Sequence, residues 1–244
     1  MFDMRLPVSA ALLALGIAAA GWFTGNGIVK ARATDRYVTV KGLAERDVQA
    51  DRAVWSISFV AASDSLDTAR KKLLADRRAV LDFLTRHGLT DAETEMQNLR
   101  VIDQEARTYT SGQPTNRYLL QQTTLVRTDK VDAIASAAEN IGALLDAGVI
   151  LGNLDGYDQG RGPHFLFTRL NDIKPAMIAE ATANARLAAG QFASDSQTAV
   201  GGVRRARQGF FEIQPADNAP GLYEPGQIHK KIRIVVTMDY LLTD

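Results

Sequence analysis

The spacing of hydrophobic residues along the chain switches between that of a strand and that of a helix. The order in which these two patterns follow each other predicts a structural unit. Trp55, Ile57 and Phe59 alternate with serines, which is typical of a strand with one buried face. From residue 66 the apolar positions are spaced as on a helix. The predicted elements are this strand, a helix over 66–87, strands over 95–105 and 117–126, a helix from Asp129 to near Gly148, and a strand over 149–157. This order predicts a split βαβ plait over residues 54–163, with both helices on one face of an antiparallel sheet.

Each predicted helix has an apolar stripe that marks its buried face. Asp64 or Ser65 is placed to cap the first helix, and Gly88 to end it. The stripe of the first helix is Ala69, Leu73, Val80 and Leu84, and that of the second is Val131, Ile134, Ala138, Ile141 and Leu145. The basic residues of the first helix are predicted to be solvated; they are Arg70, Lys71, Lys72, Arg77 and Arg78.

The plait is predicted to be inserted into a discontinuous α+β domain made of residues 36–53 and 164–244. Strands are predicted over 36–42, 164–168 and 203–213, and in the last strand Ile232, Ile234, Val236, Met238 and Tyr240 share a face. A long helix opens near Asn171, and its stripe is Met177, Ala181, Ala185, Ala188 and Phe192. Because small residues dominate this stripe, the helix should lie flat on the sheet. The fold class is therefore α+β, with two-layer α/β sandwiches and antiparallel sheets.

Residues 1–32 are predicted to be a signal anchor, a transmembrane helix that stays in the membrane. The apolar run continues past Ala18-Ala19-Ala20, where a signal peptidase could cut, and reaches the ~20 residues that span a bilayer. A cleaved signal peptide is the alternative. The basic residues after the run favour a cytoplasmic domain, whereas a short basic head before it is typical of exported proteins. We expect an envelope protein anchored in the inner membrane, with its folded domain in the periplasm.

Composition excludes several classes of partner and site. The 28 basic residues equal the 28 acidic ones, so no net charge attracts nucleic acid and no such partner is expected. The absence of cysteine excludes disulfides, thiolate nucleophiles and zinc ribbons. His87, His164 and His229 fall in unrelated elements, and the sequence has no paired-histidine, nucleophile-elbow or P-loop motif.

Two groups of acidic and amide residues are candidates for a metal site or an acid–base pair. Asn153, Asp155 and Asp158 could offer oxygen atoms to calcium, but their spacing is not that of an EF-hand. Glu45, Asp47 and Asp51 cluster more closely, yet carboxylates along a strand and its turn are more typical of a solvated face. We therefore expect no catalytic, cofactor-binding or metal-binding residues, no cofactor and no enzymatic activity.

Five blocks of sequence, in order, resemble the SIMPL-domain family of bacterial envelope proteins. They are RYVTVKGLAERDVQADRAVWSISF, EMQNLRV, RYLLQQTTLVRTDKVDAI, IKPAMIAEATANARLAAGQFA and KKIRIVVTMDYLL. Each block alone is unspecific, whereas the ordered set is fairly specific. The resemblance implies a two-part α+β domain, export to the envelope, ring- or channel-like oligomers in some members, and a link to oxidative-stress tolerance. It implies no reaction and no catalytic residues.

The leading functional hypothesis is a non-enzymatic envelope protein that self-associates. The half-polar stretch Gln121, Gln122, Thr123 and Thr124 is typical of a strand that pairs with another chain through a sheet edge, and equally of a sheet surface that faces solvent. A homo-oligomer is the expected assembly. One alternative is a small-ligand receptor or enzyme that uses a cleft between the domains, near Glu45, Asp47 and Arg161. Another is an adaptor that docks an envelope protein through the proline-rich loop over 214–227.

Overall fold

The chain divides into two units. The computed structural model describes residues 5–33, 36–106, 115–154, 162–217 and 219–243, and within the first of these ranges it describes the side chains of residues 13–27. Unit 1 comprises Met1–Glu45, Pro175–Phe211 and Arg233–Asp244, and unit 2 comprises Arg46–Lys174 and Glu212–Ile232. The segment 54–163, predicted as an insertion, lies within unit 2, which also contains residues 46–53, 164–174 and 212–232.

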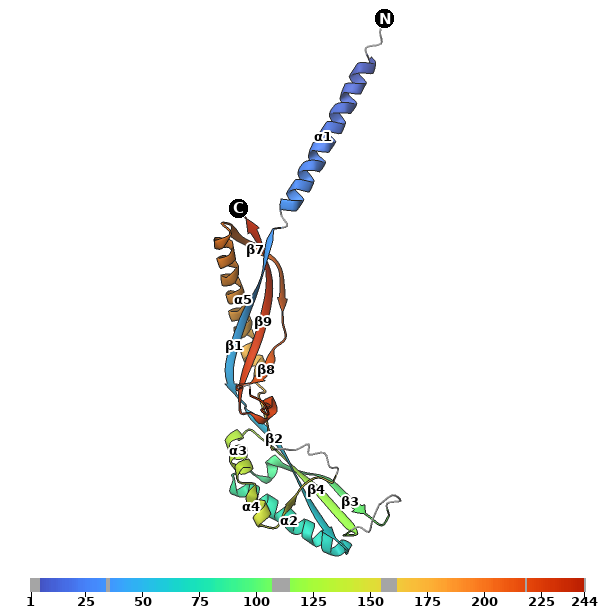
Figure 1. The fold of residues 1–244 in the computed structure, drawn as a ribbon, viewed down its shortest axis with the longest axis vertical. Coiled ribbons are helices and arrows are strands. Elements are labelled where there is room, and N and C mark those ends of the chain that lie inside the picture. Colours follow the sequence, from blue (N-terminus) through green and yellow to red (C-terminus); the bar gives the residue numbers. More distant parts are fainter. Residues whose placement is uncertain (1–4, 34–35, 107–114, 155–161, 218, 244) are drawn as a thin grey trace. The chain divides into compact units, whose positions relative to one another are not determined.

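Unit 2 is built on an antiparallel sheet (Figure 1). Its strands are β2 (Arg52–Ser63), β3 (Thr94–Asp103), β4 (Tyr118–Thr128), β5 (Ile150–Leu151) and β6 (His164–Leu166). Their order is β3-β4-β2-β5, with β6 also paired to β2. β2 and β4 pair from Ala53 opposite Thr128 to Ser63 opposite Tyr118. The α+β class with antiparallel sheets is confirmed, and the strand order is that of a split βαβ plait.

Three helices pack against one face of this sheet. They are α2 (Leu66–Arg86), α3 (Val131–Glu139) and α4 (Gly142–Asp146). The strand residues Trp55, Ile57 and Phe59 share one buried cluster with the predicted α2 stripe of Ala69, Leu73, Val80 and Leu84. α2 is followed by Gly88 with φ 79, a left-handed conformation that glycine adopts without strain. Ser65 is the N-cap residue, but its side chain makes no capping hydrogen bond.

The second predicted helix is interrupted, because α3 ends before α4 begins. Ala137 and Leu144, seven residues apart, are fully buried, whereas Leu145 is 59% exposed. Ala138 and Ile141 are only partly buried. The predicted stripe is therefore wrong in its second half, because the buried face includes Ala137 and Leu144 in place of Ala138 and Leu145.

A second sheet has the order β1-β9-β7, with β8 also paired to β9 (Figure 1). Its strands are β1 (Tyr37–Gln49), β7 (Ala199–Gln208), β8 (Glu212–Pro215) and β9 (His229–Thr243). Of these strands, β7 belongs to unit 1 and β8 to unit 2, while β1 and β9 have residues in both units. The β9 residues predicted to share a face are all buried; they are Ile232, Ile234, Val236, Met238 and Tyr240. The strand predicted over 203–213 is divided into β7 and β8. At the division, the backbone N–H of Gly209 donates to the carbonyl oxygen of Val235 at 2.9 Å.

Helix α5 (Leu170–Asp195) packs on this sheet with its backbone very close to β1. A Cβ atom on Gly42 would lie 1.8 Å from the carbonyl oxygen of Ala181 and 2.5 Å from the backbone nitrogen of Ala185. The absence of a side chain at Gly42 is what permits this approach. The prediction that a small-residue helix lies flat on the sheet is confirmed at this point of contact.

The buried stripe of α5 differs from the predicted one in its last two turns. The buried residues are Met177, Ala181, Ala185, Ala189 and Ala193. The prediction placed Ala188 and Phe192 in the stripe instead, but Phe192 is 58% exposed. The flat sheet accepts alanine at every fourth position, so the larger phenylalanine is excluded from the contact.

The proline-rich segment between β8 and β9 contains the short helix η2 (Glu224–Gly226). It is held to β9 by Lys230, which is fully buried. The Lys230 ammonium group donates to the Glu224 carbonyl oxygen at 2.7 Å and also to the Glu224 carboxylate. Leu222 and Tyr223, next to η2, are 48% and 69% exposed. Docking of an envelope protein on this loop stays a prediction.

The N-terminal segment forms one helix, α1 (Arg5–Ala33). Within the described residues, no helix is both long enough and apolar enough to cross a membrane. The transmembrane helix predicted over 1–32 is therefore not found among them.

Candidate functional site

A polar hollow opens in unit 2 beside β2. β2 pairs with β6 at residues 52–54 and with β5 at residues 59–60, and the hollow of ≈ 500 Å³ lies along the residues between them. The described residues that line it are Trp55, Ser56, Ile57, Ser58, Asn98, Ile141, Leu151, Gly152, Asn153 and Gly162. A second hollow of ≈ 360 Å³ shares Ser58, Asn98 and Asn153 with it, and adds Leu99, Arg100, Gln121 and Thr123.

Polar side chains form a row on the sheet face that is turned away from the helices. Side chains alternate between faces along a strand, so Ser56 and Ser58 lie opposite the core residues of β2. The hydroxyl groups of Ser58 and Thr123 are hydrogen bonded at 2.8 Å. The side-chain oxygen of Gln121 accepts the backbone N–H of Leu154 at 3.0 Å. Gln121 and Thr123 are only 6% and 8% exposed, Ser58 is partly buried and Ser56 is exposed, so the row runs from a shielded end on β4 to an open end on β2.

A bulge in β3 places Asn98 in the lining of both hollows. The register with β4 shifts between Gln97, opposite Thr123, and Arg100, opposite Gln121. Asn98 has φ 49, a left-handed conformation that asparagine tolerates better than most residues. An asparagine inside a strand pattern is the signal that could have predicted this bulge, because asparagine is depleted from regular strands.

The lining limits the chemistry of the hollows. Among the described residues that line them there is no carboxylate and no histidine; Arg100 is the charged group. General acid–base catalysis needs a group that titrates near neutral pH, and the described lining residues include no carboxylate or histidine for that role. Hydroxyl and amide groups can both donate and accept hydrogen bonds. The arrangement is suited to binding an uncharged polar ligand.

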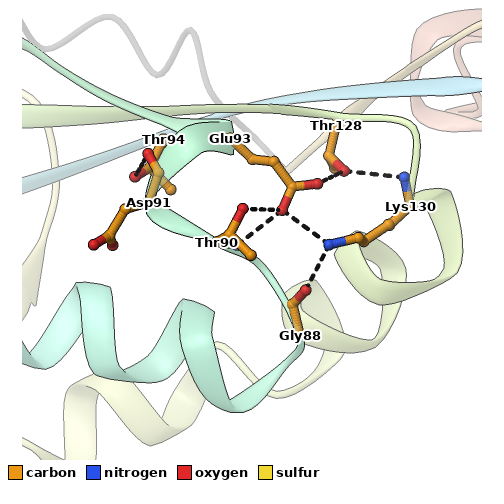
Figure 2. A network of polar contacts seen from close by, with 7 residues as sticks. All are labelled: Gly88, Thr90, Asp91, Glu93, Thr94, Thr128 and Lys130. Carbon is orange, nitrogen blue, oxygen red and sulfur yellow. Dashed lines mark hydrogen bonds and ion pairs between the residues drawn. The ribbon is translucent and has the colours of Figure 1, made fainter.

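The most strongly perturbed carboxyl group lies elsewhere, in a polar network around Glu93 (Figure 2). Thr128, at the end of β4, donates its hydroxyl to one carboxylate oxygen of Glu93. The other oxygen accepts the backbone N–H of Thr90 at 2.8 Å and the Lys130 ammonium at 3.0 Å. The same ammonium donates to the carbonyl oxygen of Gly88 at 2.9 Å. These bonds join the end of α2, the short helix η1 (Asp91–Glu93), β4 and the start of α3.

These contacts give Glu93 an unusually low pKa. The hydrogen bond from Thr128 is the main cause; burial acts against it, and the bonds from Thr90 and Lys130 add to it, so that the pKa falls from 4.5 to about 2. Each donor stabilises the ionised form. Glu93 does not line the polar hollows. We interpret the network as a structural clamp between elements of unit 2.

The clamp predicts how stability depends on pH. Because the folded-state pKa of Glu93 lies below its ordinary value, its contribution is present above pH 4.5 and is lost as the pH falls towards 2. Allowing for partial solvent access, we expect this loss to be about 1–2 kcal/mol of unfolding free energy. A Thr128→Val variant should lose about 1 kcal/mol at neutral pH and depend less on pH below 4.5. Urea unfolding from pH 7 to 3 measures both effects.

A matched control for this variant is Thr85→Val. The hydroxyl of Thr85 donates to the carbonyl oxygen of Leu81 within α2 at 2.9 Å, and no carboxylate is involved. The control should keep the wild-type dependence on pH. An unchanged pH dependence in Thr128→Val would contradict the assignment of the low pKa to this hydrogen bond.

The three histidines have separate surroundings. The Nδ1 atom of His87 is 2.9 Å from the carbonyl oxygen of Phe83, and the two rings are 4.5 Å apart. His164 begins β6, and His229 begins β9. Among the described residues, no group of three or more histidine, aspartate or glutamate side chains could hold a metal ion.

The acidic cluster of Glu45, Asp47 and Asp51 is not brought together as one site. Glu45 lies 3.7 Å from Arg233 and Asp47 lies 3.9 Å from Lys231, as ion pairs with β9. Asp51 instead accepts the backbone N–H groups of Thr168 and Arg169 at 2.9 and 3.2 Å. Burial acts to raise the pKa of Asp51, but the hydrogen bonds from Thr168 and Arg169 together lower it. These contacts give each carboxylate a structural role.

Parts of two predictions lie outside the described residues. Asn153 lines both hollows, whereas Asp155 and Asp158, which share its turn and were not expected to bind calcium with it, are outside the described residues. Arg161, proposed with Glu45 and Asp47 to line an interdomain cleft, is outside them too. Glu45 belongs to unit 1 and Asp47 to unit 2, and a cleft between the units stays a prediction.

The half-polar stretch of β4 does not lie at a sheet edge. β4 is paired on both sides, with β2 and β3, so it has no edge to offer to another chain. Its side chains alternate between the two faces: Gln121 and Thr123 lie by the second hollow, and Thr124 is fully buried. The end positions of the two strand orders are instead taken by β3 and the two-residue strand β5 in one sheet, and by β1 and β7 in the other.

The family described as "SIMPL: Protein of unknown function (DUF541)" matches residues 38–240. The match covers most of the chain and includes all the described residues that line the polar hollows. No curated protein is significantly similar to the chain.

Proposed function

This chain belongs to the SIMPL family, and on that premise we propose that it is a non-enzymatic envelope protein whose folded part self-associates. Its N-terminal segment would hold it to the inner membrane, with the folded part in the periplasm. The process in which it acts would be tolerance of envelope or oxidative stress. The described lining of the polar hollows consists mainly of hydroxyl, amide and apolar groups, with Arg100 as its one charged side chain, and this supports a function by binding and contact.

The observation that carries self-association is the exposure of strand β7. β7 is at one end of the order β1-β9-β7, and most of its residues are exposed in the isolated chain. An edge strand of this length presents backbone groups that another strand can pair with. At the other end of this order, the backbone of α5 lies close to Gly42 on β1. We therefore propose β7 as the surface through which copies of the chain associate.

Charge favours one particular partner strand. β7 carries Arg204, Arg205 and Arg207, so pairing of β7 with a second β7 would bring like charges together. The edge strand β3 of unit 2 carries the exposed Glu95 instead. We propose that β7 of one copy pairs with β3 of another. Such a contact joins two different surfaces, and repeated contacts of this kind close into a ring or extend into a filament.

The side chains of α1 support the proposed membrane attachment. Its described apolar residues are strongly exposed; they are Leu13, Leu15, Ile17, Trp22 and Phe23, at 66–76%. Apolar side chains on a helix are normally covered by protein or by lipid. Lipid is the cover that we propose for this segment.

Membrane fractionation followed by light scattering tests both parts of this proposal. We expect the full chain to pellet with membranes, to dissolve in detergent, and to scatter as an oligomer of defined mass. Arg205→Glu should weaken the oligomer, because it removes one side of the β7–β3 charge match. Glu95→Lys in the same chain should restore it. Arg78→Glu, on the exposed surface of α2, is the matched control and should leave the oligomer unchanged.

Each part of the proposal can fail separately. A chain that is a monomer at every concentration contradicts self-association. An oligomer that ignores the charge reversals contradicts the β7–β3 contact. Recovery of all the protein in the soluble fraction, with a mature amino terminus that begins after Ala20, contradicts the anchor.

A further inference from the structure

We propose that the polar hollow of unit 2 binds a neutral saccharide that carries an acetamido group. This inference goes beyond self-association and does not depend on it, because both hollows are lined by residues of unit 2 alone. The larger hollow has a volume of ≈ 500 Å³, within the ~300–1,000 Å³ typical of small-ligand sites. The second hollow of ≈ 360 Å³ extends it along the same polar row.

The described residues that line the larger hollow carry no charge, and their hydrogen-bonding groups favour an uncharged ligand rich in hydroxyl or amide groups. One hydrogen bond joins the hydroxyl groups of Ser58 and Thr123, and it uses the O–H of one of them. The O–H of the other and the remaining lone pairs of both can bind a ligand. The side-chain oxygen of Gln121 is used by Leu154, while its amide nitrogen makes no hydrogen bond within the described part of the chain. A saccharide hydroxyl can both donate and accept a hydrogen bond, so it can pair with the hydroxyl groups of Ser58 and Thr123 and with the amide nitrogen of Gln121.

The backbone at Asn98 is a second, independent feature of the site. A bulge and a left-handed φ of 49 at a residue other than glycine are uncommon, and such features concentrate where a side chain must be re-aimed. Here they place the Asn98 side chain in the lining of both hollows. Asn98 therefore offers an amide donor and acceptor where the two spaces meet.

The apolar part of the lining distinguishes an acetamido sugar from a plain one. Ile141 and Leu151 line the larger hollow together with the polar residues. An acetamido group has a methyl group for such an apolar wall, and a carbonyl oxygen and an N–H for the serine and asparagine side chains. A saccharide with hydroxyl groups alone would leave the apolar wall without a matching group.

Titration calorimetry on the full chain in detergent tests the inference. The probe is N,N′-diacetylchitobiose, and cellobiose is the matched probe with the same linkage and no acetamido group. We expect saturable binding of the first with a dissociation constant of ~1 mM or tighter, and binding of the second at least about tenfold weaker. A capped neutral tripeptide is the third probe and should not bind in a saturable way.

Two variants locate the binding in the hollow. Asn98→Gly removes the amide and keeps the left-handed backbone that glycine accepts, so the fold should persist. Ser58→Ala removes one hydroxyl of the polar row. Each should weaken diacetylchitobiose binding by about tenfold. Gln197→Gly is the matched control, since Gln197 also has a positive φ, of 55, and does not line the hollows.

Every outcome decides the proposal. Tight, saturable diacetylchitobiose binding that both variants weaken, with the control unchanged, supports it. Absence of binding overturns it, and so does binding that neither variant changes. Equal binding of cellobiose overturns the assignment of the acetamido group. Saturable binding of the tripeptide alone shows that the ligand is a peptide and overturns the saccharide class.

Discussion

Replacing Gly42 with alanine is expected to destabilise unit 1 by about 3 kcal/mol or more. The added Cβ atom would lie 1.8 Å from the carbonyl oxygen of Ala181 and 2.5 Å from the backbone nitrogen of Ala185. Both are backbone atoms, so a change of rotamer cannot relieve the clash. The helix α5 would have to move away from β1, and the contacts of its alanine stripe would be lost with it.

Urea unfolding of the full chain, followed by circular dichroism, measures this effect. Gly202→Ala is the matched control, because a Cβ atom at Gly202 on β7 meets nothing within 4 Å. The control should be as stable as the parent or slightly more stable, since alanine restricts the unfolded chain. Equal stability of the two variants would show that α5 is not held against β1 at Gly42.

Replacing Lys72 with methionine is expected to cost about 3 kcal/mol, although the change is on a helix surface. Lys72 donates to the carboxylate of Asp76, whose side chain is 3% exposed, and to the carbonyl oxygen of Gly148 at 2.8 Å. The Oδ2 atom of Asp76 has no hydrogen-bond partner among the described residues. Without Lys72 the buried carboxylate would lose its counter-ion as well, which is the costly way to break a buried ion pair.

The double variant Lys72→Met with Asp76→Leu separates this cause from a loss of packing. It removes both charges, so it should regain most of the stability lost by the single variant. Lys71→Met is the control, because Lys71 pairs with Asp67 at the same spacing on an exposed part of α2, and it should have no measurable effect. If the double variant is less stable than Lys72→Met, the unpaired charge of Asp76 is not the cause of the stability lost in the single variant.

Lys72 and Asn98 illustrate what local patterning cannot reveal about single residues. The sequence assigns Lys72 to a solvated surface together with its basic neighbours, because on a helix wheel it is simply another charged residue. Its partial burial comes from Gly148, far away in the chain, whose carbonyl oxygen it contacts. Asn98 lies inside a predicted strand, and only the register against β4 shows that the strand bulges there.

The sequence by itself determined the family, the α+β class, the order of strands and helices, and the buried faces of β2, β9 and α2. It could do so because periods of 2 and 3.6 residues are imposed by the backbone and can be read within one segment. Only the tertiary structure decided which strands are edges, where the second helix of unit 2 breaks, and which residues line the polar hollow. Ser58, Asn98, Gln121 and Asn153 come from four separate segments. Their meeting depends on strand pairing and on a bulge, and neither has a period in the sequence.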